Sequence, residues 1–215
     1  MGQKKSKLTS QKVMIWGTLG AMGIFYGLFL LIPILYALAG SFCDWNPMIG
    51  QMDFKGIENY KTIFTSTALI NTLFFTIVVT FFRVSLGIIL AVLIDSIGIF
   101  KSFFRTVYFL PVVASIVAIS LVWVWIFEPT SGILNQILGF FGIQGLGWLK
   151  DQNLALPSVM IATIWKDVGF AMVFYLAGLN GISRSLYEAA EVDGAGPVQK
   201  FFKIQLPMLS STTVL

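Results

Sequence analysis

The sequence E-A-A-E-V-D-G at residues 188–194 is followed, after nine residues, by I-Q-L-P at residues 204–207. This polar stretch lies between strongly apolar segments. Gly194 and Gly196 can adopt the left-handed backbone that ends a helix, and Pro197 suits the first position of a new one. The stretch therefore predicts two short helices joined by a turn, which form an elbow at the protein surface.

The first of these helices has a predicted start as well as a predicted end. Ser185 and Glu188 have the spacing of a capping box, in which the serine caps the first turn and the glutamate reaches back. This spacing predicts a helix over residues 186–192. The small side chains of Ala189 and Ala190 would let another protein approach its backbone closely.

The composition of the chain is that of an integral membrane protein. Its 215 residues are 57% hydrophobic and 11% charged, with a mean hydropathy of +0.85, whereas soluble domains are about 25% charged. The net charge of +4 does not indicate nucleic acid binding, because the basic residues flank apolar segments. Cys43 stands alone and histidine is absent, so we expect no disulfide, no metal site and no catalytic residue. No Walker-type phosphate loop is present, so ATP is not expected to bind this chain.

The apolar runs predict an all-α, polytopic membrane helix bundle. Residues 1–12 form a basic tail, and residues 13–42 run without a charge for longer than the roughly 20 residues that cross a bilayer. Ala37-Leu38-Ala39 resembles a signal-peptide cleavage site, but the run before it exceeds a signal core, so an uncleaved anchor kinked at Pro33 is favoured.

The rest of the chain divides into a loop and a core. Residues 43–70 are expected to form an external loop with a short surface helix. The core, residues 71–215, is predicted to contain spans at about 71–94, 107–127 and 155–176, the elbow loop at 180–207, and the start of a fifth span at 208–215.

The distribution of lysine and arginine predicts the orientation. With a cytoplasmic N-terminus, nine basic residues flank the spans inside and three lie outside. The inside residues are Lys4, Lys5, Lys7, Lys12, Lys101, Arg105, Arg184, Lys200 and Lys203, and the outside ones are Lys55, Lys61 and Lys150. The elbow is therefore expected in the cytoplasm.

The 188–207 pattern resembles the EAA loop of the binding-protein-dependent ABC importer permeases, and so implies a bundle of the type I importer kind. The resemblance implies that the elbow couples to a separate ABC ATPase dimer, which binds the ATP, and that Glu188 contacts an arginine there. The implied coupling residues are Glu188, Ala189, Ala190, Asp193, Gly194, Ile204, Leu206 and Pro207. A second permease subunit, an extracytoplasmic solute-binding protein and the bacterial inner membrane are the other implied partners. The alternative is an amphipathic helix resting on lipid headgroups.

Further segments resemble the sugar-transport branch of these permeases, the maltose and glycerol-phosphate type. They are Phe104-Arg105-Thr106, Phe109-Leu110-Pro111, residues 132–138, Trp148-Leu149, residues 164–166 with Gly169-Phe170, and Ala177-Gly178-Leu179. The family has two spans after the EAA loop where this chain has a stub, so the chain is expected to be C-terminally truncated. The sequence leaves the transported sugar open.

Four residues inside the predicted spans could line a solute path or form a buried ion pair: Arg83, Trp165, Lys166 and Asp167. A charge at bilayer depth costs about 2.5–3.5 kcal/mol and therefore needs a partner or a water-filled cavity. Arg83 and Asp167 each lie about 12 residues into parallel spans, at a depth of about 18 Å. We expect these two groups to face each other within direct or one-water reach. Trp165 and Trp123 could stack on a sugar ring, although tryptophan is also common near membrane interfaces.

Three rival functions remain. A permease for a polyamine, phosphate or a peptide would share the EAA loop. An intramembrane enzyme would need a reactive cluster at one membrane face, and the sequence offers none. A secondary transporter would not need the EAA pattern.

Overall fold

The computed structural model describes residues 2–46, 48 and 50–213. The chain divides into two compact units, Met1–Ile70 and Asn71–Leu215. Within these described residues, three helices are long and apolar enough to cross a membrane, or four if a bent pair of helices counts as one span. The regular structure of the described part is helical apart from one small hairpin, as the sequence predicts.

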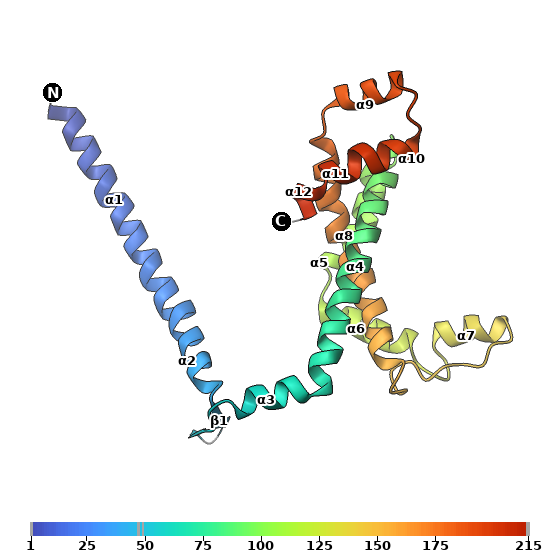
Figure 1. The fold of residues 1–215 in the computed structure, drawn as a ribbon, viewed down its shortest axis with the longest axis horizontal. Coiled ribbons are helices and arrows are strands. Elements are labelled where there is room, and N and C mark those ends of the chain that lie inside the picture. The colour runs from blue at the N-terminus through green and yellow to red at the C-terminus, as the bar shows by residue number, and fades with distance from the viewer. Residues whose placement is uncertain (1, 47, 49, 214–215) are drawn as a thin grey trace. The chain divides into compact units, whose positions relative to one another are not determined.

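The first unit begins with one long helix (Figure 1), which contains a π-helical turn in its second half. It consists of α1 (Gly2–Tyr26), the π-helical turn η1 (Gly27–Leu31) and α2 (Ile32–Gly40). The amide of Ile32 donates to the carbonyl of Gly27, five residues back. Pro33 follows directly, and its missing N–H and bulky ring disfavour the normal α-helical bond at this point. The kink predicted at Pro33 thus takes the form of a widened turn, and the basic tail, apart from Met1, continues the helix.

The loop expected at residues 43–70 contains more regular structure than the sequence predicted. Strands β1 (Cys43–Asn46) and β2 (Gln51–Phe54) pair antiparallel, and α3 (Glu58–Thr65) follows them. Pro47 and Ile49 of this loop lie outside the described residues.

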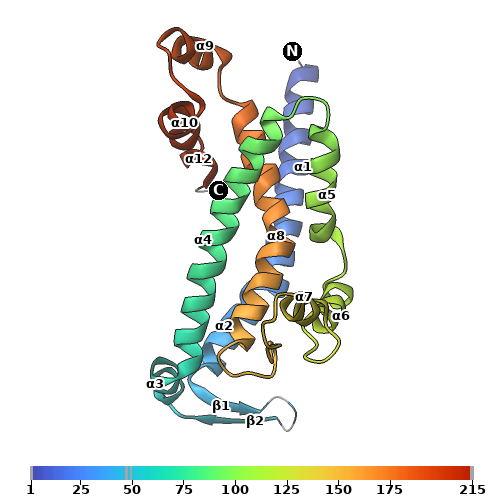
Figure 2. The same ribbon diagram turned by 90° about the vertical axis from the view of Figure 1, so that its right-hand side faces the viewer.

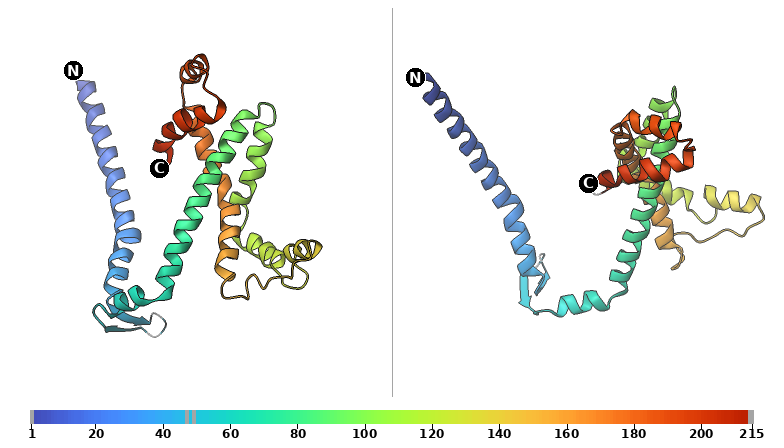
Figure 3. Two further views of the ribbon diagram at one scale, coloured as in Figure 1. Left: turned by 45° about the vertical axis from the view of Figure 1, so that its right-hand side comes forward. Right: turned by 45° about the horizontal axis from the view of Figure 1, so that its top comes forward.

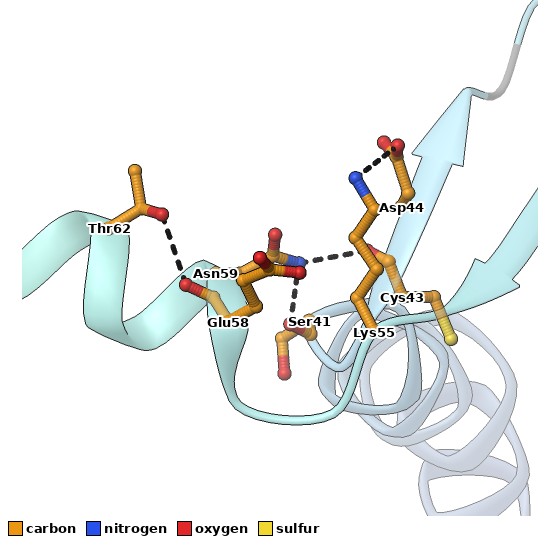
Figure 4. A network of polar contacts seen from close by, with 7 residues as sticks. All are labelled: Ser41, Cys43, Asp44, Lys55, Glu58, Asn59 and Thr62. Carbon is orange, nitrogen blue, oxygen red and sulfur yellow. Dashed lines mark hydrogen bonds and ion pairs between the residues drawn. The ribbon is translucent and has the colours of Figure 1, made fainter.

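A polar network holds the hairpin against the start of α3 (Figure 4). The Nδ2 of Asn59 donates to the carbonyl oxygens of Ser41 and Cys43, at 3.0 and 2.9 Å. Lys55 pairs with Asp44 at 2.8 Å, and this hydrogen bond and charge raise the pKa of the lysine. The segment between α2 and α4 therefore has a defined shape.

The second unit is built around two long helices, α4 (Thr67–Ser96) and α8 (Ala155–Asn180), seen in Figures 2 and 3. A Cβ on Gly87 of α4 would lie 2.7 Å from the Cβ of Ala171 on α8, so only glycine allows this approach. Small residues at such contacts are typical of packing between membrane helices. The buried core gathers beside this contact, from Ile88, Ala91, Ile94, Met172, Tyr175, Leu176, Leu179, Ile182 and Leu209.

The span expected at residues 107–127 is broken into two helices in the structure. The structure has α5 (Lys101–Val113) and α6 (Ile116–Ile126), bent by 97° at a short break. Ala114 and Ser115 are extended, with ψ of 150° and 128°, and this interrupts the helix. Helix α5 also begins six residues earlier than expected, and Lys101 in its first turn pairs with Asp95 near the end of α4.

Helix α5 packs tightly along α8 through a second glycine. A Cβ on Gly169 would lie 1.9 Å from the carbonyl oxygen of Tyr108. The two backbones are therefore in direct contact, and beyond this contact the chain bends by 97° into α6.

The segment between α6 and α8 is a loop that carries the short helix α7 (Ile133–Phe140). Buried Asn135 organises it. Its Nδ2 donates to the carbonyls of Pro129 and Leu146, and its Oδ1 accepts from the amide of Leu146 and from Trp148 Nε1, all at 2.8–3.0 Å. Every polar atom of this amide group is thereby used on the loop itself.

Candidate functional site

The elbow projects from one end of the second unit, beyond the ends of α4 and α8 (Figure 1). Its first arm is α9 (Arg184–Val192), which starts two residues earlier than predicted. The N-cap is Ser183, without a side-chain cap bond, and its hydroxyl lies 2.8 Å from that of Ser185. The predicted capping box is wrong, because Ser185 already lies inside the first turn.

The turn of the elbow depends on Gly194, whose φ of +73° is left-handed as predicted. The amide of Ala195 closes the turn by donating to the carbonyl of Ala190 at 2.8 Å. Gly196 is extended instead, with φ −70° and ψ 170°, and caps α10 (Pro197–Lys200). The left-handed prediction is thus wrong for Gly196, whereas Pro197 starts α10 as expected.

The second arm returns toward the bundle through α10, the π-helical turn η2 (Phe201–Gln205), α11 (Leu206–Met208) and α12 (Ser210–Thr213). The amide of Leu206 donates to the carbonyl of Phe201, just before Pro207. Leu209 is 1% exposed, and the hydroxyl of Tyr175 on α8 donates to Thr213 at 3.2 Å. The predicted start of a fifth span is a pair of short helices here, and residues 214–215 lie outside the described part of the chain.

An ion pair that the sequence did not indicate joins the two arms. Lys200 Nζ lies 2.8 Å from Glu191 Oε1, and the side chains are 19% and 66% exposed. The two residues lie on opposite sides of the Gly194 turn, so no helical spacing could have revealed the contact. The pair thus connects α9 to α10 across the Gly194 turn.

Of the eight predicted coupling residues, six are exposed and two are half-buried. Glu188, Ala189, Asp193 and Gly194 are exposed on α9 and its turn, and no described residue forms an ion pair with Glu188. Ala190 is half-buried, while Leu206 and Pro207 are exposed on the second arm. Ile204 packs against the buried core together with Tyr187 and Phe201. The elbow thus presents the carboxylate of Glu188 and the small side chain of Ala189 outward from a packed base.

The second set of candidate residues adjoins a cavity of about 350 Å³ between α6 and α8. Its walls are formed by Ile116, Ile119, Ser120, Trp123, Val124, Phe127, Leu149, Val159, Ala162, Thr163, Lys166 and Asp167. Lys166 and Asp167 pair at 3.4 Å, with side chains 20% and 33% exposed. Trp165 is outside this lining but contacts Trp123 edge-to-face, with ring centroids 5.6 Å apart. Charged, hydroxyl and aromatic groups therefore meet at one apolar-walled pocket, the usual make-up of a small-molecule site.

The sequence predicted Arg83 and Asp167 within direct or one-water reach, and no direct ion pair joins them among the described residues. Among the described residues, Asp167 pairs with Lys166 and Arg83 has no ion pair. Asp167 faces α6, whereas the side of α8 turned to α4 is apolar. That side lines a separate groove of about 560 Å³ with α4 and α5, through Pro157, Met160, Ile161, Ile164, Trp165 and Val168. The side chains of Thr163 and Ser120 also line the cavity, because α8 and α6 face each other there. The sequence did not single out these two residues.

These features define a helical membrane protein with a protruding elbow. The family described as "Binding-protein-dependent transport system inner membrane component" matches residues 83–215. The chain belongs to this family, which consists of transport components of ABC transporters.

Several relatives are similar over most of the chain. The probable ABC transporter permease protein YurN of Bacillus subtilis is 36% identical, over 84% of this chain and 64% of the relative. The xylose/arabinose import permease protein XacH of Haloferax volcanii is 36% identical, over 83% of this chain and 58% of the relative. A probable permease of Pyrococcus horikoshii is 34% identical and is covered to 68%. The chain thus spans roughly three fifths to two thirds of the length of these relatives.

The fold is similar to that of solved transporters. A bacterial ABC transporter involved in the import of the acidic polysaccharide alginate matches with a TM-score of 0.77 and 25% identity, over 98% of this chain and 72% of that one. The alginate transporter in complex with an alginate pentasaccharide-bound periplasmic protein matches with a TM-score of 0.80 and 27% identity, over 96% and 70%. The helical bundle of the importer permeases is therefore the fold of this chain.

Proposed function

We propose that the full-length protein is a permease subunit of an ATP-driven importer for a carbohydrate. It works with a second permease, an ABC ATPase dimer and an extracytoplasmic solute-binding protein, and its N-terminus is cytoplasmic. The observation that carries the proposal is the elbow, whose exposed carboxylate and small residues project from the bundle on a base packed into the core. The names of the relatives, which include a xylose/arabinose permease and glycerol-phosphate permeases, support the solute class.

The elbow is suited to transmit movement because one of its faces is exposed and the other is packed against the core. The exposed face of α9 is free for a partner, whereas Tyr187, Phe201 and Ile204 join it to the core formed by α4 and α8. A push on α9 therefore reaches the helices through packed side chains. ATP binds to the partner ATPase, and this chain contributes the surface on which the closure of the ATPase acts.

Replacement of Glu188 tests this coupling. In the full-length protein, Glu188→Ala removes a carboxylate that is exposed in the permease and would be buried in the complex, where loss of one partner of an ion pair can cost about 2–5 kcal/mol. We expect normal membrane insertion, weaker co-purification of the ATPase and a sharp loss of solute uptake. Asp53→Ala on β2 is a matched control, since Asp53 is also an exposed carboxylate but is expected on the opposite side of the membrane. Full uptake and full ATPase binding by Glu188→Ala would contradict the assignment.

The cavity between α6 and α8 is our candidate for part of the solute path. A sugar offers hydroxyl groups that need hydrogen-bond partners, and Thr163, Ser120, Lys166 and Asp167 provide them beside the ring of Trp123. Thr163→Val keeps the side-chain shape while removing a hydroxyl. We expect reduced uptake with an intact complex and normal ATPase binding, measured with labelled pentose, disaccharide and glycerol phosphate. Uptake of a polyamine or a peptide in place of these solutes would overturn the carbohydrate assignment.

A further inference from the structure

Helix α7 exposes an apolar stripe that no described residue covers. Ile133, Ile137, Phe140 and Phe141 are 42%, 50%, 86% and 70% exposed, and they follow one another on one face of the helix. The rings of Phe140 and Phe141 meet edge-to-face, with centroids 5.4 Å apart. Two such exposed aromatic rings are unusual for a face that contacts only water.

The stripe is held in a fixed direction. The opposite side of α7 carries buried Asn135, which takes part in four hydrogen bonds within the loop. The start of the loop is fixed by Glu128, whose carboxylate accepts from the amides and hydroxyls of Thr130 and Ser131. These bonds hold the pKa of Glu128 at about 2. The outward face of α7 is thus set by polar bonds behind it.

The position and charge of the stripe indicate what it meets. The twenty-one residues from Pro129 to Leu149 contain no charged side chain, whereas Glu128 and Lys150 stand directly at the two ends. Helix α7 lies at the end of the bundle where α8 begins, and it runs across the direction of α8 (Figure 1). It follows α6, an apolar helix whose residues Ile116, Val117, Leu121 and Trp125 are each more than half exposed.

We propose that the stripe of Ile133, Ile137, Phe140 and Phe141 rests in the interfacial layer of the lipid bilayer. The inference depends on the membrane placement of the proposed function. Short amphipathic helices with aromatic and aliphatic residues on one face bind at the boundary of headgroups and acyl chains, where aromatic rings are enriched. A lipid surface accounts for the continuity with α6. The absence of charge offers nothing for electrostatic pairing with a protein partner. Contact with the bilayer fixes the depth, relative to the membrane surface, of the loop between α6 and α8, which ends at the N-terminus of α8.

A depth measurement tests this proposal. In the full-length transporter carrying Cys43→Ser, the variants Phe141→Cys and Ile137→Cys are labelled with a nitroxide, and the assembled complex is reconstituted in phosphatidylethanolamine and phosphatidylglycerol vesicles. Collision with oxygen, which dissolves in lipid, is compared with collision with a water-soluble nickel chelate. Gln152→Cys, at an exposed polar position beyond Lys150, is the control. We expect oxygen to be favoured at both positions of the stripe and nickel to be favoured at position 152.

Each other outcome overturns the proposal. Nickel access at positions 137 and 141 equal to that at 152 would mean that the stripe faces water. Protection from both reagents would mean that a protein subunit covers it, either the second permease or the solute-binding protein. Two positions are used because one substitution could disturb α7 itself. Solute uptake by the unlabelled complex tests the transport function separately. Failure of the proposed lipid contact can therefore be distinguished from failure of the proposed transport function.

Discussion

The contact between Gly169 and Tyr108 makes the substitution Gly169→Ala strongly disruptive. The new Cβ would lie 1.9 Å from the carbonyl oxygen of Tyr108, whereas ordinary contact begins at 3.4 Å. The difference of 3.4 − 1.9 = 1.5 Å must be met by moving α5 away from α8, because the obstacle is backbone. Overpacking costs typically about 1–3 kcal/mol, and occasionally more, and we expect the upper end here. At about 2–4 °C per kcal/mol for a domain of this size, the unfolding midpoint should fall by about 6–12 °C.

The assay is thermal unfolding of the purified full-length protein, followed by tryptophan fluorescence. Gly139→Ala on α7 is a matched control, because its Cβ would meet nothing within 4 Å. Removing a helix-interior glycine there should leave the midpoint unchanged or raise it, since glycine costs about 0.5–1 kcal/mol relative to alanine in a helix. An unfolding midpoint for Gly169→Ala equal to that of Gly139→Ala would refute the proposed backbone contact.

The contact of Gly87 provides a comparison for this test, because the nearest atom to its added Cβ belongs to the side chain of Ala171. Gly87→Ala should also destabilise the protein, since its Cβ would lie 2.7 Å from the Cβ of Ala171. Adding Ala171→Gly removes that atom and should restore much of the lost stability, leaving contacts of 3.3 Å to the backbone. No side-chain truncation at Tyr108 should rescue Gly169→Ala in the same way.

Three further predictions concern the polar networks. Asn135→Leu should leave Trp148 Nε1 and the amide of Leu146 without their acceptor. The cost is about 1–3 kcal/mol for each donor that stays buried, and it should appear as a lower unfolding midpoint and faster proteolysis of the loop. Unchanged proteolysis would argue against the network. Asn59→Ala should free the hairpin from α3 at a cost of about 1 kcal/mol, measured as faster amide hydrogen exchange in β1 and β2 with no change in α8. Because the pKa of Glu128 is lowered from 4.5 to about 2, its bonds to Thr130 should be complete above pH 4.5 and lost as the pH falls through about 2. Glu128→Gln should abolish this pH dependence of amide exchange at residue 130, and a dependence that persists in the variant would assign it to another group.

Much of the architecture follows from local properties of the chain. The length and apolar character of a run are local properties, and they suffice to predict a membrane helix. The helices of the structure therefore lie close to the predicted spans, at Lys12–Gly40, Thr67–Ser96 and Ala155–Asn180. Proline and glycine act on their own backbone, which is why the turn at Gly194 and the start of α10 at Pro197 were also predictable. The resemblance of residues 188–207 to the EAA loop led to the correct family for the same reason, since the motif is a short continuous stretch.

The sequence could not determine which groups meet across the bundle. Lys166 rather than Arg83 pairs with Asp167, because α8 turns that carboxylate toward α6 and turns an apolar side toward α4. The 97° bend after α5 lies within a continuous apolar run. Hydropathy alone therefore predicted one span for this run. The contact of Lys200 with Glu191 joins two arms of the elbow whose approach depends on the whole turn. Periodicity reports which side of one element is apolar, whereas these contacts depend on the distance and rotation between elements, which only the packed tertiary structure sets.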